Sequence, residues 1–341
     1  MPSAAIYDCE GALPTDEERA FFRDVDPAGF ILFARHCETS EQIVRHTDAL
    51  KEAVGREDVL ILVDQEGGRV ARLQPPAFPA HQPMAVFGKM WRLDPARARK
   101  AARLNAYLLG RMTASLGINV NCVPMLDVPQ IDSDPVVIGD RVIASHPEQI
   151  AALGAEVIAG LMEGGALPVI KHLPGHGRSL VDSHHDLPEV TASQRDLQAT
   201  DFPPFKANAD ALIGMTAHIV YTAYDKTRCA TMSPTVIKDV IRGKIGFDGL
   251  LLSDDVKMKA LQGPLELRAK ESLEAGCDAA LLCNFTMAEK RDAAPHVPAL
   301  EGAALARYKM ALAALPARPE ADDLSDEYAQ LADLMKPGLV A

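Results

Sequence analysis

The stretch that decides the fold reads ALPVIKHLPGHGRSLVDSHHDLP and spans residues 166–188. Its first five residues form a largely apolar run, and the eighteen that follow contain four histidines, two aspartates, two prolines and two glycines. An apolar run that opens into polar, sharply turning sequence is typical of a buried strand leading into a functional loop. We therefore expect a strand here, followed by a loop that carries chemistry.

Similar apolar runs recur along the chain, separated by longer amphipathic stretches. The predicted strands are Ala4–Tyr7, Gly29–Ala34, Val59–Asp64, Ile118–Val123, Leu167–Lys171, Ala211–Thr216, Gly249–Ser253 and Asp278–Cys283. The intervening stretches have helix start signals at Thr15, Ser40, Asp94 and Ser233, and glycine end signals at Gly55, Gly117, Gly246 and Gly276. Strands that are apolar throughout suit a parallel sheet covered on both faces. Eight strand–helix units predict an α/β fold, a single (β/α)8 barrel of the TIM type.

The strand–helix pattern weakens after Asn284, and only helices are expected beyond it, near residues 302–315 and 326–335. No stretch elsewhere has the composition of a linker between two domains. We therefore expect residues 1–341 to form one catalytic barrel domain, with residues 286–341 as flanking helices.

Charge and composition narrow the classes of ligand. The formal net charge of −12 disfavours a nucleic-acid surface or an anionic membrane as partner. The amino terminus lacks the pattern of a signal peptide and no apolar run is long enough to span a bilayer, so a cytoplasmic location is expected. The six cysteines stand singly, without a C-x-x-C pair, and predict reduced thiols with neither disulfides nor a zinc cluster. A small-molecule substrate is the remaining expectation.

Two aspartates follow strongly apolar runs, Asp64 after ILV and Asp254 after LLLS. A carboxylate at such a position is costly unless it is paired, hydrogen-bonded or used in chemistry. Each aspartate alone could cap the next helix or pair with Arg69 or Arg72. Because all strand ends of a barrel meet at one rim, the two carboxylates and the histidine loop together favour an active site there.

The histidine loop admits three interpretations from its residues alone. Its polar side chains could be solvated turn residues, or His172, His176 and His184 could bind a metal, although no compact zinc signature is present. The third interpretation is general acid/base catalysis. Asp182 and His184 are two residues apart and can lie on one side of an extended segment, where the carboxylate would orient the imidazole.

Several motifs in the chain are shared with one known family. In order they are DPAGFILFAR, VDQEGGRVARL, INVNCVPMLDV, IGDR, KHLPGHGRSLVDSHHDLP, MTAHIVY and GFDGLLLSDDVKM, over roughly residues 10–285. The chain thereby resembles a bacterial β-N-acetylhexosaminidase of glycoside hydrolase family 3, of the single-domain type that acts in peptidoglycan recycling. The family implies a retaining exo-β-N-acetylglucosaminidase that cleaves terminal N-acetylglucosamine from anhydro-muropeptides by double displacement, without a metal or other cofactor.

The resemblance also implies roles for individual residues. Asp254 would be the nucleophile that forms a glycosyl-aspartate intermediate, and His184, paired with Asp182, would be the general acid/base. The residues implied to hold the sugar ring are Asp64, Arg72, Arg141, Lys171 and His172. A retaining glycosidase normally uses two carboxyl groups, so histidine would here replace the second one.

Three alternatives to this function remain: a β-glucosidase-like member of the same family, a metal-dependent hydrolase, and a non-catalytic sugar-binding relative. No role is assigned to His176 or His185.

Overall fold

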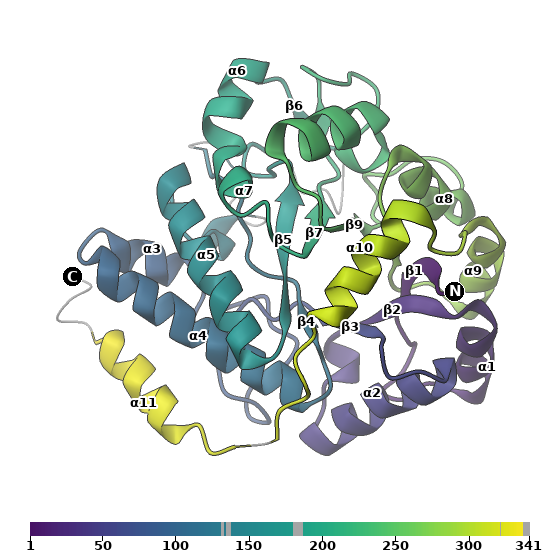
Figure 1. The fold of residues 1–341 in the computed structure, drawn as a ribbon, viewed down its shortest axis with the longest axis horizontal. Coiled ribbons are helices and arrows are strands. Elements are labelled where there is room, and N and C mark those ends of the chain that lie inside the picture. Colours follow the sequence, from purple (N-terminus) through teal and green to yellow (C-terminus); the bar gives the residue numbers. More distant parts are fainter. Residues whose placement is uncertain (131–132, 134–137, 180–186, 321, 337–341) are drawn as a thin grey trace.

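The structure is a computed structural model that describes residues 1–130, 133, 138–179, 187–320 and 322–336. Eight parallel strands close into a barrel in the order β1-β10-β9-β7-β5-β4-β3-β2 (Figure 1). The barrel strands are β1 (Ser3–Tyr7), β2 (Pro27–Leu32), β3 (Leu60–Val63), β4 (Val120–Asn121), β5 (Leu167–Leu173), β7 (Ile213–Thr216), β9 (Leu250–Asp255) and β10 (Ala279–Leu282). Each coincides with one predicted strand, and the predicted (β/α)8 barrel is confirmed.

Helices surround the barrel as an outer layer. They are α1 (Asp16–Val25), α2 (Ser40–Val54), α3 (Ala85–Trp91), α4 (Pro95–Ser115), α5 (Pro147–Gly164), α6 (Gln194–Asp196), α7 (Pro203–Ala207), α8 (Leu265–Ala275), α9 (Met287–Ala293), α10 (Gly302–Ala313) and α11 (Ser325–Leu334). Short 3-10 or π-helical segments are η1 (Ala34–His36), η2 (Gly139–Arg141), η3 (Leu197–Asp201), η4 (Ala230–Met232), η5 (Val236–Ile245) and η6 (Ala294–His296).

The helix ends follow the predicted signals with one correction. Thr15 caps α1 and forms a capping box with Glu18, and Asp94 caps α4. The predicted cap Ser40 is instead the first residue of α2, because the hydroxyl of Thr39 accepts the hydrogen bond from the Gln42 backbone N–H. Ser and Thr are both good caps, so residue type alone does not decide between these two adjacent positions.

Two apolar layers hold the barrel together. One fills the barrel interior with side chains such as Ile6, Leu62 and Val169, and the other lies between the strands and the outer helices. Helix α10 packs against the interior layer through Tyr308, whose hydroxyl donates to the carbonyl of Ala28 at the start of β2 (2.8 Å). Because Ala28 lies at the start of β2, helix α10 covers the amino ends of the strands, at the end of the barrel away from the predicted active site. Each buried aliphatic side chain in the two layers contributes roughly 1.5–3 kcal/mol of transfer free energy.

A second, two-stranded parallel sheet anchors the far end of the histidine loop. It pairs β6 (Glu189–Val190) with β8 (Val220–Tyr221). On the near side, the Tyr221 hydroxyl donates to the carbonyl of Gly175 (2.6 Å). Gly177 packs so closely that a Cβ there would lie 2.0 Å from the carbonyl oxygen of Val128. The described residues on both sides of the loop are thus fastened to the barrel top.

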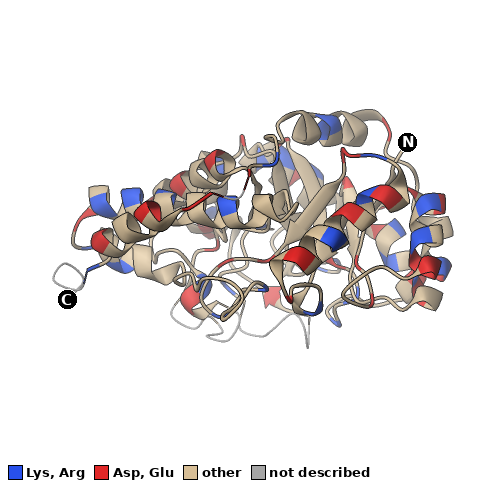
Figure 2. Cartoon of the chain, turned by 90° about the horizontal axis from the view of Figure 1, so that it is seen from below, with Lys and Arg blue, Asp and Glu red and all other residues tan. Residues whose placement is uncertain are grey.

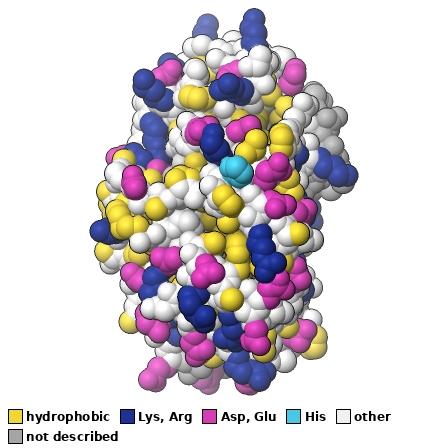
Figure 3. Space-filling model, turned by 90° about the vertical axis from the view of Figure 1, so that its right-hand side faces the viewer, with side chains coloured by type: hydrophobic (Ala, Val, Ile, Leu, Met, Phe, Trp, Pro, Cys, Tyr) yellow, Lys and Arg dark blue, Asp and Glu magenta, His cyan; other side chains and the backbone are white. Residues whose placement is uncertain are grey.

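The outer surface carries charges of both signs. Figure 2 shows Lys and Arg interspersed with Asp and Glu along the outer helices, and Figure 3 shows the same mixture, with small apolar patches, on the flank that contains α1, α8 and α9. The carboxy-terminal helix α11 packs on α4, where the Arg97 guanidinium donates to the carbonyl of Leu334 (2.7 Å). None of the helices in the described part of the chain is long and apolar enough to cross a membrane.

Candidate active site

A pocket of about 400 Å³ opens at the carboxyl ends of the barrel strands. The structure brings six of the eight predicted site residues to its walls: Asp64, Arg72, Arg141, Lys171, His172 and Asp254. Asp64 directly follows β3, Lys171 and His172 belong to β5, and Asp254 is near the end of β9. The predicted acid/base pair, Asp182 and His184, lies outside the described residues, as does His185.

A cluster of paired charges forms one wall of this pocket. The side chain of Lys171 is 2% exposed, and its ammonium lies 2.9 Å from Asp64 Oδ1 and 2.7 Å from Glu66 Oε1. Arg141 donates from Nε and Nη2 to the two carboxylate oxygens of Glu66 (2.9 and 2.8 Å). Arg72 Nη2 donates to Asp64 Oδ2 at 3.1 Å. Because every charge has an opposite partner, the cluster tolerates burial that would otherwise neutralise its members.

The pKa values of this cluster indicate that it stays charged at neutral pH. Burial acts to raise the pKa of the Asp64 carboxyl, but the charges of Lys171 and Arg72 outweigh it and hold that pKa well below the usual range. Burial likewise opposes ionisation of Glu66, yet Lys171 and Arg141 lower its pKa to about 2. Burial acts to lower the pKa of Lys171, and the two carboxylates raise it above the usual value. The wall therefore offers fixed hydrogen-bond donors and acceptors to a polar ligand.

Glu66 is a central member of this cluster that the sequence reasoning did not assign. It is 1% exposed and joins Lys171 to Arg141. The signal was available in the motif DQEGG, since Asp64 and Glu66 are two residues apart and an extended segment brings such residues to the same side. A carboxylate this close to an apolar strand needs a cationic partner, and Lys171 supplies it.

Asp127 is a second unassigned residue and it orients two histidines. Its carboxylate is 2.7 Å from Nδ1 of His172 and accepts the backbone N–H of His176. Burial opposes ionisation of Asp127, but the neighbouring histidines and these hydrogen bonds lower its pKa. An ionised carboxylate can only accept, so Nδ1 of His172 carries the proton. Asp127 thereby sets the tautomer of a residue predicted to bind the sugar.

His176, to which the sequence analysis assigned no role, also lines the pocket. Its ring meets the ring of His172 edge to face, with centroids 5.4 Å apart. Burial, followed by the nearby charge of His172, lowers the pKa of His176 to about 4, so its imidazole is neutral at neutral pH. Within the described ranges, no three His, Cys, Asp or Glu residues are grouped in a way that could hold a metal ion.

Asp254 and Asp255 are neighbours with opposite pKa shifts. Burial acts to raise the pKa of Asp254, but His218, His172 and the backbone N–H of Asp255 (2.8 Å) bring it below the usual value. Burial, supported by the charge of Asp254, raises the pKa of Asp255 to about 7. Asp255 also accepts the backbone N–H of Lys257 at 2.9 Å. At neutral pH, Asp254 is therefore ionised, whereas about half of the Asp255 carboxyl remains protonated.

Comparison with known proteins gives the family. The sequence pattern described as the glycosyl hydrolase family 3 N terminal domain matches residues 7–307. The chain belongs to glycosyl hydrolase family 3. Within this family it is a glycoside hydrolase of the β-N-acetylhexosaminidase type, as the sequence motifs predicted.

Two of the similar proteins are bacterial enzymes named beta-hexosaminidase. The one from Alkalilimnicola ehrlichii is 39% identical over 81% of this chain and 79% of its own length, and the one from Bordetella avium is 34% identical over 83% and 81%. Among solved structures, NagZ from Neisseria gonorrhoeae in complex with N-trifluoroacetyl-D-glucosamine superposes with a TM-score of 0.87. It is 30% identical, and the match covers 100% of this chain and 98% of that one.

A substitution of Glu66 tests the buried cluster of this family 3 chain. Glu66→Gln leaves Lys171 and Arg141 with one carboxylate fewer. Removing one partner of a buried ion pair leaves the other charge buried without compensation, which costs about 3–5 kcal/mol of stability. We expect the free energy of unfolding, measured with a denaturant, to fall by an amount of that order. Glu57→Gln is the matched control, since Glu57 pairs with Lys51 while its side chain is 89% exposed. Equal stability of the two variants would contradict the proposed importance of the cluster.

The raised pKa of Asp255 predicts a pH-dependent stability. The Asp255 carboxyl has a pKa of about 7 in the folded protein and about 3.9 in the unfolded chain, so the folded state binds this proton more tightly. The free energy of unfolding of the wild type therefore falls as the pH rises from about 3.9 to about 7. Asn cannot ionise. The unfolding free energy of Asp255→Asn relative to wild type should therefore increase between about pH 5 and about pH 8, on the order of 1 kcal/mol or more.

The exposed Asp210 provides the control for this titration, because Asp210→Asn makes the same chemical change at the surface. Chemical unfolding curves of the three proteins at both pH values give the comparison. If the stability difference between Asp255→Asn and wild type did not change with pH, the assigned titration would be wrong.

Proposed function

We propose that the chain is a retaining exo-β-N-acetylglucosaminidase that removes terminal N-acetylglucosamine from anhydro-muropeptides in the cytoplasm. The observation that carries the proposal is the pocket in which the ionised Asp254 shares one space with the charged cluster of Asp64, Arg72, Arg141 and Lys171. A retaining glycosidase needs a carboxylate at the anomeric carbon and several fixed polar groups that hold the sugar hydroxyls.

The proposed reaction is a double displacement. A carboxylate oxygen of Asp254 attacks the anomeric carbon, the bond from that carbon to the leaving oxygen breaks, and His184 protonates the leaving sugar. His184, now neutral, then takes a proton from water, which attacks the anomeric carbon and breaks its bond to Asp254. Two inversions at this carbon retain the β configuration, and Asp182 orients His184 in both steps.

The pKa contrast at the end of β9 supports Asp254 over Asp255 as the nucleophile. A protonated carboxyl is a poor nucleophile, and the pKa of Asp255 is about 7 whereas that of Asp254 is lowered. Each carboxyl accepts a backbone N–H, Asp254 from Asp255 and Asp255 from Lys257, so these hydrogen bonds do not distinguish the two. The pKa contrast is the difference that favours Asp254 for attack.

The cation-lined wall supports a polar, uncharged sugar as the group bound beside Asp254. Arg72, Arg141 and Lys171 are already paired with Asp64 and Glu66, so the wall combines donors and acceptors instead of presenting unpaired positive charge. Hydroxyl groups both donate and accept hydrogen bonds, and such a mixed wall suits them.

Hydrolysis of defined substrates tests the function. Wild-type protein should release N-acetylglucosamine from the anhydro-muropeptide with a kcat/KM at least about tenfold above that for chitobiose, equivalent to about 1.4 kcal/mol of transition-state discrimination. A preference for aryl glucosides would favour the β-glucosidase-like alternative. Loss of activity after exhaustive chelation, with recovery on adding metal, would favour a metal-dependent hydrolase.

Covalent trapping tests the nucleophile. A 5-fluoro N-acetylglucosaminyl donor should leave an adduct on Asp254, detected by mass spectrometry of the peptide that contains LLLSDD. Asp254→Ala should lose the adduct and lower kcat by roughly a thousandfold or more, a barrier change of about 4 kcal/mol. Asp255→Asn is the matched control and should still form the adduct. An adduct on Asp255 would reverse the assignment, and no adduct with wild type would support a non-catalytic sugar-binding protein.

A further inference from the structure

Asn284 is a polar residue at the pocket rim that the proposed reaction does not use. It follows β10 as part of the strand-end pair Cys283-Asn284, is exposed, and lines the same pocket as Asp254. In the closed barrel, β10 lies across from β4, which has β3 and β5 on its two sides. Asn284 therefore faces the charged wall of the pocket from the opposite side.

Three segments of the chain hold Asn284 in place. Its backbone N–H donates to Asp8 Oδ2 beyond β1 (2.7 Å), and its carbonyl oxygen accepts from the ammonium of Lys257 (2.7 Å). Its side-chain oxygen accepts from Nη1 of Arg35 at 2.9 Å, and the same guanidinium pairs with Asp8. Both the position and the rotation of the amide are thereby determined.

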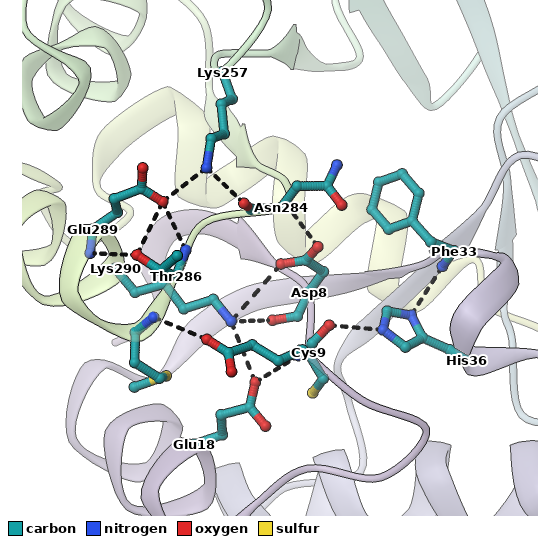
Figure 4. Close-up of polar contacts among 12 residues, drawn as sticks. Asp8, Cys9, Glu18, Phe33, His36, Lys257, Asn284, Thr286, Glu289 and Lys290 are labelled. Atoms are coloured by element: carbon teal, nitrogen blue, oxygen red, sulfur yellow. Dashed lines mark hydrogen bonds and ion pairs between the residues drawn. The ribbon is translucent and has the colours of Figure 1, made fainter.

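The support beneath Asn284 is buried. Lys290 on α9, 0% exposed, donates to the backbone carbonyl of Asp8 (2.7 Å) and to Glu18 Oε1 (3.3 Å). Figure 4 shows the Asn284 amide extending from this cluster on the side where Phe33, another pocket residue, lies. Charged groups from α1, α9 and the end of β1 thus fix the position of Asn284, although its side chain is exposed.

The direction of the amide follows from the chemistry of its partner. A guanidinium only donates hydrogen bonds, so the oxygen of the Asn284 amide must face Arg35 and its nitrogen must point elsewhere. Among the residues that the structure describes, no hydrogen bond from this nitrogen is formed. Its two N–H groups are thus free to donate to an acceptor in the pocket.

We propose that Asn284 is a substrate-binding residue that donates a hydrogen bond from its amide nitrogen to an oxygen of the terminal sugar. This inference rests on the proposed function, because the sugar attacked by Asp254 must occupy the pocket that Asn284 lines. A neutral donor suits a hydroxyl or N-acetyl carbonyl oxygen. It adds recognition on the side of the sugar that the charged cluster does not face.

A purely structural role for Asn284 has a clear physical basis and needs a separate test. Its φ is +58°, a left-handed conformation that Asn adopts more readily than most residues and that Gly adopts freely. Asn284→Gly therefore keeps the backbone conformation and removes the amide, together with the hydrogen bond that the amide oxygen accepts from Arg35. Asp26→Gly is the matched control, since Asp26 also has a positive φ (40°) and lies at the end of α1, away from the pocket residues.

Steady-state hydrolysis of an aryl N-acetylglucosaminide measures the effect. Loss of one neutral hydrogen bond is worth about 0.5–1.5 kcal/mol, so Asn284→Gly should lower kcat/KM by between about twofold and about tenfold. Asn284→Asp keeps an oxygen for Arg35 but replaces the donor by an acceptor, and its loss should be larger than that of the glycine variant. Asp26→Gly should retain the wild-type kcat/KM.

The outcomes separate this inference from the function on which it rests. If wild type did not hydrolyse the substrate, the proposed function would fail; if wild type were active and Asn284→Gly matched it, only the role of Asn284 would fail. Should Asn284→Gly melt below the assay temperature, the kcat/KM of Asn284→Asp relative to wild type decides, and a kcat/KM equal to that of wild type overturns the proposal.

Repeating the assay with an aryl glucoside identifies the acceptor atom. A loss of kcat/KM confined to the N-acetylglucosaminide indicates the N-acetyl oxygen, and an equal loss on both substrates indicates a ring hydroxyl.

Discussion

The pocket depends on one buried interaction, the contact of the Lys171 ammonium with the carboxylates of Asp64 and Glu66. Because only 2% of the Lys171 side chain is exposed, its ammonium loses most of its hydration, and only close opposite charges make that burial tolerable. These ion pairs join the end of β5 to the segment after β3, and the pair between Glu66 and Arg141 joins that segment to η2. The geometry of one wall of the pocket therefore follows from the electrostatics of these buried charged groups.

A second charged assembly faces the first across the barrel. Asp8 and the buried Lys290 support the rim at β1 and β10, where Arg35 and Asn284 are held. Between the two assemblies, β9 delivers adjacent carboxyls whose environments move their pKa values in opposite directions. Such separation of two similar groups by their surroundings is a recurring way for enzymes to assign different roles to chemically identical side chains.

Much of this architecture was predictable because local rules and the global fold agree. The apolar runs predicted as strands, such as ILV before Asp64, each form a barrel strand, and caps such as Thr15 begin helices as expected. The comparisons place the chain in glycosyl hydrolase family 3, which its motifs had already indicated. Glu66 and Asp127 escaped assignment because each was one acidic residue among many, and its importance depends on partners more than 40 positions away along the chain.

The sequence by itself determined the eight-stranded barrel, the rim on which polar residues gather, and the family. Hydrophobic periodicity and capping are local, so they can be read without knowing which segments meet. Only the tertiary structure decided which of Asp254 and Asp255 has the lowered pKa, which tautomer His172 adopts, and which way the Asn284 amide points. Each of these properties depends on burial and on the charge or hydrogen-bonding partner that folding brings alongside. Burial and partner cannot be inferred from the residues next to each position in the sequence.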